Sequence, residues 1–152
     1  MNTLFVCDGN IARSPMAEGM LRAFLAKRGI GGVHVSSCGL HVNRTEAHPM
    51  LKLVMGKDHE MLNGFRPRPI TLELVREADF VLTMEARHVR EILRRSPEIT
   101  ANISVVTAFA DQSGEIEDFG GGETDVFLHS LQQCHASLER CLSGIVDKLQ
   151  AS

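Results

Sequence analysis

Cys7 and Arg13 are the residues whose types and spacing could do chemistry near the start of the chain. They flank the stretch Asp-Gly-Asn-Ile-Ala, residues 8–12, which follows an apolar run and precedes a helical pattern. A loop of this length can turn its backbone N–H groups toward a tetrahedral oxyanion, and the helix that follows adds the positive end of its dipole. The guanidinium of Arg13 can hold two oxygens of such an anion at once. The pattern therefore indicates a phosphate-binding loop.

The same surroundings favour a nucleophilic Cys7. A thiol that faces a helix N-terminus, backbone amides and a guanidinium has its pKa lowered to about 3.5–7.5, so it is largely a thiolate at neutral pH. Gly9 and Asn10 are residue types that tolerate left-handed backbone angles, which converging amides require. Ser14 is expected to be the N-cap of the helix and to donate its hydroxyl to the Cys7 sulfur, with Pro15 at the first helical position.

The string Val-Cys-x-Gly-Asn-x-x-Arg-Ser-Pro-Met-Ala-Glu, residues 6–18, resembles the low-molecular-weight protein tyrosine phosphatase family. That family also contains bacterial arginine phosphatases and thioredoxin-coupled arsenate reductases. The resemblance implies a phosphatase without metal or cofactor, in which Cys7 is the nucleophile and Arg13 binds and stabilises the phosphoryl group. The substrate-binding loop would consist of Asp8, Gly9, Asn10, Ile11, Ala12 and Ser14.

A general acid is expected on the loop before the last helix. The family carries an Asp-Pro-aromatic-Gly-Gly string there, and the Asp protonates the leaving oxygen. Counting back without gaps from Phe127, the acid falls on Asp118, and Glu117 takes its place if the loop is shifted by one residue. Phe119 replaces the family's Pro, which frees the backbone at Asp118 and could provide an apolar wall for an aromatic leaving group.

Four further positions refine the resemblance. Ser37 matches a family Ser that supports the Asn of the loop, here Asn10, while Cys38 stands where Ala is usual and is interpreted as a packed side chain. Ile11 occupies a position where arginine phosphatases have Thr, which points to an aryl phosphate. Ala12 replaces a second Cys that many members use for a reversible disulfide.

The elements that must position these residues follow from hydrophobic periodicity. Strand, helix and strand in succession predict a right-handed crossover and a parallel sheet. We expect an α/β fold in one domain, residues 1–152: a three-layer doubly wound sandwich with a four-stranded parallel sheet and helices on both faces. The family resemblance implies strand order 2-1-3-4. The predicted strands are 3–7, 33–36, a segment within 78–84, and 103–106. The predicted helices are 15–28, 47–55, one that has Thr71 as its N-cap and runs to about Glu77, 85–95, and a final one with its apolar stripe from Phe127 to Ile145.

Several polar and thiol side chains allow two interpretations. Asp58-His59 could be an acid/base pair, although polar residues at a surface turn are the simpler interpretation. Arg66 and Arg68 could attract an acidic substrate or lie on a solvated loop, and the bracing His that family members often carry near Phe65 is absent. Cys134 and Cys141 fall on the apolar stripe of the last helix and are expected to pack in the core.

Composition limits the class of protein. The chain has 152 residues and a net charge of −3, so no electrostatic footprint suggests nucleic acid or an anionic membrane as partner. Its four cysteines show neither CxxC pairs nor metal spacing. The start of the chain has no secretion signal pattern, and we expect a cytoplasmic monomer.

Together these features predict hydrolysis of phosphotyrosine in a protein or peptide through a cysteinyl-phosphate, with inorganic phosphate as product. Three alternatives stay open: a phosphoarginine phosphatase, an arsenate reductase, and a phosphate-binding module weakened by the missing Pro. The arsenate reductases place two further cysteines just after the third strand, where residues 82–86 hold none.

Overall fold

The computed structural model describes residues 1–99, 102–118 and 124–152. Within these residues, parallel strands form one sheet in the order β2-β1-β3-β4, as predicted. Val6 in the central strand lies beside Cys38 on one side and Thr83 on the other. The strands are β1 (Asn2–Cys7), β2 (His34–Gly39), β3 (Phe80–Thr83) and β4 (Asn102–Val105).

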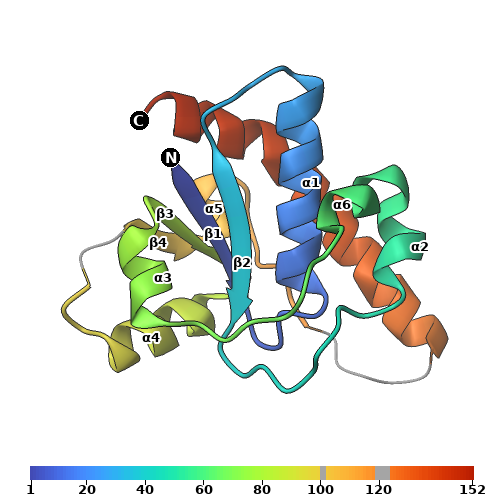
Figure 1. The fold of residues 1–152 in the computed structure, drawn as a ribbon, viewed down its shortest axis with the longest axis horizontal. Helices are drawn as coiled ribbons and strands as arrows, with labels where there is room; N and C mark the ends of the chain where they lie inside the picture. Colours follow the sequence, from blue (N-terminus) through green and yellow to red (C-terminus); the bar gives the residue numbers. More distant parts are fainter. Residues whose placement is uncertain (100–101, 119–123) are drawn as a thin grey trace.

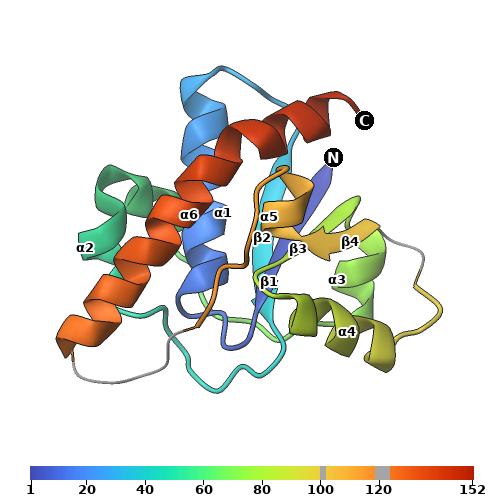
Figure 2. The ribbon, with the colours of Figure 1, turned by 180° about the vertical axis from the view of Figure 1, so that it is seen from behind.

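Helices cover both faces of the sheet, which confirms the expected three layers. Figures 1 and 2 show α1 and α6 together on one face, while α3 and α4 lie on the other. No helix within the described residues combines the length and apolarity needed to span a bilayer. The helical elements are α1 (Arg13–Lys27), α2 (Leu51–Met55), the 3-10 helix η1 (Gly56–Leu62), α3 (Leu72–Glu77), α4 (Ala86–Arg95), α5 (Val106–Phe109) and α6 (Thr124–Gln150).

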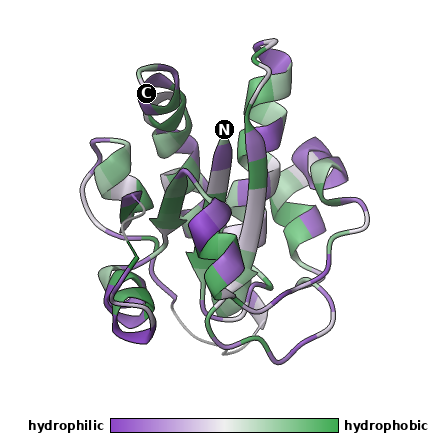
Figure 3. Ribbon diagram, turned by 60° about the vertical axis from the view of Figure 1, so that its left-hand side comes forward, coloured by the Kyte–Doolittle hydropathy of each residue, from purple (hydrophilic) through white to green (hydrophobic). Residues whose placement is uncertain are grey.

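The alternation of side chains along β1 gives each face its own core. Leu4 and Val6 pack in the cluster shared with α3 and α4, whereas Phe5 and Cys7 belong to the larger cluster with α1 and α6. The helix ribbons in Figure 3 alternate between hydrophobic and hydrophilic segments along their length, as expected for helices with one buried side. Cys7 therefore faces the α1–α6 layer from the carboxyl end of a central strand. This end of the strands is where open α/β sheets bind ligands.

The start of α1 differs from the prediction. The helix begins at Arg13 with Ala12 as N-cap, and no side chain caps it, so the assignment of Ser14 as N-cap and Pro15 as first residue is wrong. Ser14 lies inside the first turn because its hydroxyl is used by Cys7 and Asn10 instead. Pro15 is still accommodated, since the first-turn N–H groups have no partner within the helix.

Other boundaries move for local reasons. The strand β2 runs on to Gly39, which pairs with Pro69 in an isolated parallel bridge, so Cys38 lies within the strand rather than after it. The helix predicted over 47–55 begins only at Leu51, and Asp58-His59 falls in η1 rather than a turn. The short helix α5 was not predicted. The expected N-cap Thr71 is confirmed: its Oγ1 accepts the Leu74 N–H at 3.1 Å.

Candidate active site

The loop of residues 8–12 leaves β1 and enters α1, which places it at the carboxyl edge of the sheet. Asn10 has φ of 55°, which confirms the expected left-handed backbone at that position. The same expectation is wrong for Gly9, whose φ lies outside that region. Asn10 tolerates the conformation because its short amide side chain is held by hydrogen bonds on both ends.

A chain of side-chain hydrogen bonds leads from Glu18 to the sulfur of Cys7. Ser37 Oγ donates to Glu18 Oε1 at 2.7 Å and accepts from Asn10 Nδ2 at 3.0 Å. Asn10 Nδ2 also donates to Ser14 Oγ at 2.8 Å, and Ser14 Oγ lies 2.9 Å from Cys7 Sγ. Because an ionised carboxylate only accepts, it orients each donor in turn, and the Ser14 proton can then be donated to the sulfur or to the Cys38 carbonyl oxygen at 3.4 Å. The expected contacts of Ser37 and Ser14 are thus confirmed.

Glu18, which the sequence motif contains but to which no role was assigned, is the buried end of this chain of bonds. It is 4% exposed, and burial raises its pKa, while Ser37 and Arg22 act in the opposite direction. Arg22 Nη1 lies 2.9 Å from Glu18 Oε2, one helical turn away. The carboxylate therefore has both a charge partner and a hydrogen-bond donor in an otherwise apolar layer.

Arg68 braces the loop from the other side. Its backbone N–H donates to Asn10 Oδ1 at 3.0 Å, and its Nε donates to the Ser37 carbonyl at 3.0 Å. Arg68 is an exposed residue of the loop, as the solvated-loop interpretation expects, and these bonds also support Asn10, where the family's bracing His is absent. Arg66 is exposed and donates to the Thr45 carbonyl at 3.3 Å.

The guanidinium of Arg13 is held at several points although it is only 5% exposed. Its Nη1 donates to Glu85 Oε2 at 2.6 Å and to the Ile116 carbonyl at 2.8 Å. Its Nη2 lies 3.1 Å from Asp8 Oδ2 and 3.8 Å from Asp118 Oδ2. Burial alone would lower the pKa of Arg13, but the charges of Cys7, Glu85 and Asp118 raise it. The group therefore stays charged in a fixed orientation.

Asp8, Glu85 and His88 bring ligand atoms within 4.8 Å of one another, which raises the question of a metal. Both carboxylates are already bound by guanidinium groups of Arg13 and Arg87, so side-chain cations balance this cluster. His88 Nδ1 accepts the Glu85 N–H at 3.1 Å, which places the ring proton on Nε2, 3.3 Å from Asp8 Oδ1. Burial would raise the pKa of Asp8, but His88 and Arg87 hold it well below its usual range.

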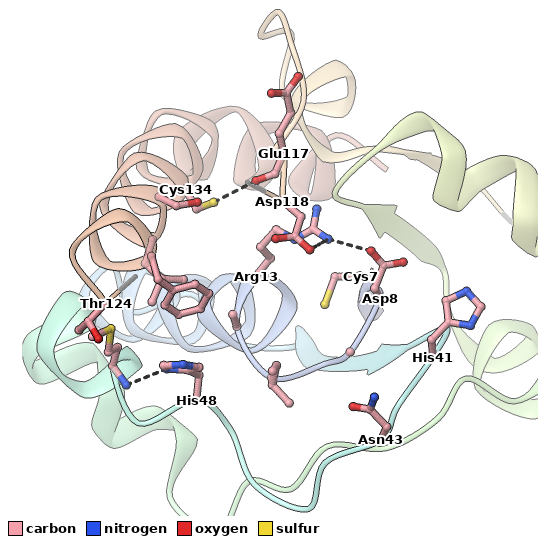
Figure 4. A pocket seen from close by; sticks show the side chains of 17 residues that line it. Cys7, Asp8, Arg13, His41, Asn43, His48, Glu117, Asp118, Thr124 and Cys134 are labelled. Atoms are coloured by element: carbon pink, nitrogen blue, oxygen red, sulfur yellow. Dashed lines mark hydrogen bonds and ion pairs between the residues drawn. The ribbon is translucent and has the colours of Figure 1, made fainter. Parts of the chain in front are cut away.

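A cavity of about 490 Å³ opens over the loop and is lined by Cys7, Asp8, Arg13 and Asp118 among others. Figure 4 shows these four side chains close together, between His48 on one side and His41 on the other. The Asp118 side chain is 51% exposed and points toward Arg13, whereas the side chain of Glu117 points away. Of these two neighbouring carboxylates, Asp118 is therefore the one that faces Arg13.

The outer part of the cavity has an aromatic wall that the sequence did not reveal. The rings of His48 and Phe127 lie 4.3 Å apart between centroids and are tilted by 34°. Burial and the charge of Arg44 lower the pKa of His48. Phe127 was expected on the core stripe of the last helix, and it lines the cavity as well as packing on the core. Phe119, the predicted wall, lies outside the described residues.

The remaining cysteines are buried, as expected. Cys38 and Cys141 are fully buried and Cys134 is 4% exposed. Burial raises the pKa of Cys38 to about 12 and that of Cys134 to about 11. Cys134 also lines the cavity, and its thiol lies 3.5 Å from the Glu117 carbonyl, so it contacts the backbone next to Asp118. Asp58 and His59 do not line this cavity.

Comparisons with known proteins agree with this geometry. The model of the family described as low molecular weight phosphotyrosine protein phosphatase matches residues 2–152. The low molecular weight protein-tyrosine-phosphatase Etp of Escherichia coli is 32% identical over 127 residues, which cover 83% of this chain and 82% of that protein. A protein-arginine-phosphatase of Bacillus subtilis is 29% identical over 152 residues, covering 99% and 97%.

Solved structures share the fold over the whole length. A Cys-to-Ser variant of the arginine phosphatase YwlE with a phosphorylated active-site serine superimposes with a TM-score of 0.81 at 25% identity and covers 100% of both chains. A YwlE mutant from Bacillus subtilis superimposes with a TM-score of 0.79 at 25% identity and covers 99% of both chains. The motif of residues 6–18, the strand order and the pocket at the end of β1 all accord with these matches. The chain belongs to the low molecular weight phosphotyrosine protein phosphatase family.

Proposed function

We propose that this chain is a protein tyrosine phosphatase that hydrolyses aryl phosphate monoesters through a cysteinyl-phosphate. The observation that carries the proposal is the convergence of the Cys7 sulfur, the Arg13 guanidinium and the Asp118 carboxylate on one cavity. In the YwlE variant, the serine that replaces the active-site cysteine is phosphorylated, which supports Cys7 as the residue that accepts the phosphoryl group here. Residues 2–152 act as one catalytic domain in this proposal.

In the first step the Cys7 thiolate attacks phosphorus in line, so an S–P bond forms as the bond to the tyrosyl oxygen breaks. Arg13 and the backbone amides of residues 8–13, including those of Gly9, Ile11 and Ala12, hold the equatorial oxygens. Asp118 gives its proton to the departing oxygen. In the second step Asp118 takes a proton from water, whose oxygen attacks phosphorus as the S–P bond breaks, which releases inorganic phosphate and the Cys7 thiolate. The Ser14 hydroxyl stabilises the returning thiolate.

The cavity suits a flat aromatic leaving group. His48 and Phe127 form its outer wall, and Ile11 presents an aliphatic side chain where a hydroxyl would be needed to bond a guanidino group. Relatives named protein-arginine-phosphatases make phosphoarginine the comparison substrate. Turnover of matched peptides with phosphotyrosine, phosphoserine or phosphoarginine tests the choice, and a preference for phosphoarginine overturns it.

Substrates are proposed to be phosphotyrosine-containing proteins or peptides, with no nucleic acid, membrane, metal or cofactor involved. The net charge of −3 gives no general attraction to polyanions. The four cysteines are free and their thiols are buried, which agrees with a reducing cytoplasm. We propose a monomer, and sedimentation of the purified chain tests that part.

The nucleophile is tested with C7S. Hydrolysis of p-nitrophenyl phosphate is expected to disappear while inorganic phosphate still binds, because the amides and Arg13 remain. Retained turnover in C7S would refute the assignment of Cys7. Thioredoxin oxidation that depends on arsenate would favour the arsenate reductase alternative, and phosphate binding without turnover in the wild-type chain would favour the binding module.

A further inference from the structure

Asp8 is an unexpected side chain to find beside a phosphate site. It directly follows Cys7, lines the cavity, and places Oδ2 3.1 Å from Arg13 Nη2. The incoming phosphate monoester carries nearly two negative charges at neutral pH, and it needs that same guanidinium. A carboxylate that faced the loop would repel the substrate and compete with it for Arg13.

Arg87, in the first turn of α4, holds this carboxylate by both oxygens. Its Nη1 donates to Asp8 Oδ1 at 3.0 Å, and its Nη2 donates to Asp8 Oδ2. The same guanidinium reaches Glu85, with Nη2 2.9 Å from Oε2 and Nε 3.3 Å from Oε1. Arg87 therefore ties the phosphate loop to the start of α4 across 79 positions of the chain.

Charge balance at the site depends on this contact. Asp8 and Glu85 both pair with Arg13 and both pair with Arg87, so two carboxylates share two guanidinium groups. Without Arg87 the two carboxylates would face Arg13 alone, and the cluster beside the phosphate position would carry a net negative charge. His88 Nε2 lies 3.3 Å from Asp8 Oδ1 but brings no fixed positive charge in its neutral form.

We propose that Arg87 is a positioning residue of the phosphatase reaction, which holds the Asp8 carboxylate against α4 and offsets its charge, so that Asp8 competes less strongly with phosphate for the Arg13 guanidinium that both can contact. The proposal rests on the proposed function only for its substrate, because inorganic phosphate probes the same site. The Arg87 side chain is 45% exposed, so its truncation leaves no buried void and the variant can fold.

The test compares R87A, R87K, D8N and the double variant D8N/R87A. R87A is expected to weaken inorganic phosphate binding by about tenfold, measured by calorimetry, and to raise KM for p-nitrophenyl phosphate similarly with a smaller effect on kcat. R87K should recover part of the lost phosphate affinity, because lysine restores the positive charge but cannot form the bidentate contact with Asp8. In the D8N background, the R87A substitution should lower phosphate affinity by less than about twofold, because the negative charge of Asp8 is already absent.

A purely structural role predicts a different pattern. The proposal is wrong if the R87A substitution lowers phosphate affinity as much in the D8N background as it does in the wild-type chain. It is also wrong if R87A binds phosphate with wild-type affinity. R90A, which removes an exposed charge from the next turn of α4, is the matched control and should bind phosphate within about twofold of wild type. If the wild-type chain hydrolyses no aryl phosphate, the proposed function fails, whereas the calorimetric comparison still decides the role of Arg87.

Discussion

The hydroxyl oxygen of Ser14 lies 2.9 Å from the sulfur of Cys7, and the hydroxyl already accepts a bond from Asn10. The Ser14 hydroxyl can therefore donate its proton to the sulfur, which is nearer than the Cys38 carbonyl oxygen at 3.4 Å. This contact ties the nucleophile to a buried polar chain that ends at Glu18.

S14A should slow turnover by about tenfold, because a hydrogen bond to a charged group contributes about 1.5–3 kcal/mol and the thiolate is the leaving group of the second step. A burst of p-nitrophenol followed by slow turnover would show that hydrolysis of the cysteinyl-phosphate has become limiting. S36A, a serine of β2 outside the bonded chain, is the control. Equal steady-state rates for S14A and wild type would contradict the role of the hydroxyl.

D118N should lower kcat for p-nitrophenyl phosphate or a phosphotyrosine peptide by at least about tenfold, because general acid catalysis contributes about 10²–10⁴ in rate. The effect should be larger for phosphotyrosine, whose leaving oxygen is more basic and needs the proton more. E117Q is the neighbouring control and should stay within about threefold of wild type, since the Glu117 side chain points away from Arg13. If E117Q lowers kcat more than D118N does, Glu117 rather than Asp118 is the general acid.

G39A should damage the phosphate loop. A Cβ on Gly39 would lie 2.6 Å from the Asp8 carbonyl oxygen and 3.0 Å from Asn10 Cβ, and backbone that close cannot yield without moving the loop. We expect a loss of about 1–3 kcal/mol in the free energy of unfolding by urea, and weaker phosphate binding. G31A meets nothing within 4 Å and should change neither, so equal behaviour of the two variants would contradict the close approach.

Iodoacetamide at neutral pH should label Cys7 and spare the other thiols of the folded chain. Burial raises the pKa of Cys38 to about 12 and that of Cys134 to about 11, so both stay protonated and become reactive only as pH rises toward those values. Mass spectrometry of peptides gives the labelled site, and urea-unfolded protein serves as the control in which every thiol reacts. Added phosphate should protect Cys7, and labelling of Cys38 or Cys134 before Cys7 would contradict the assignment of Cys7 as the reactive thiol.

The sequence by itself determined the features that are local or periodic. Cys7, residues 8–12, Arg13 and the helix that follows are adjacent in the chain, so their spacing alone predicts a loop around an oxyanion. Apolar runs separated by amphipathic helices predict a parallel α/β sheet, since such a crossover has only one favourable hand. The family resemblance added the strand order and the contact of Ser37 with Asn10, and both were confirmed.

Only the tertiary structure decided which distant side chains complete the site. Arg87 reaches Asp8, and Arg68 braces Asn10, because the order and register of the strands bring their loops to one edge of the sheet. His48 meets Phe127 because α2 and α6 pack together on the same face. No periodicity or local spacing encodes such contacts. The start of α1 was mispredicted for a related reason: the hydroxyl of Ser14, a good N-cap in isolation, finds stronger partners in Cys7 and Asn10 once the chain is folded.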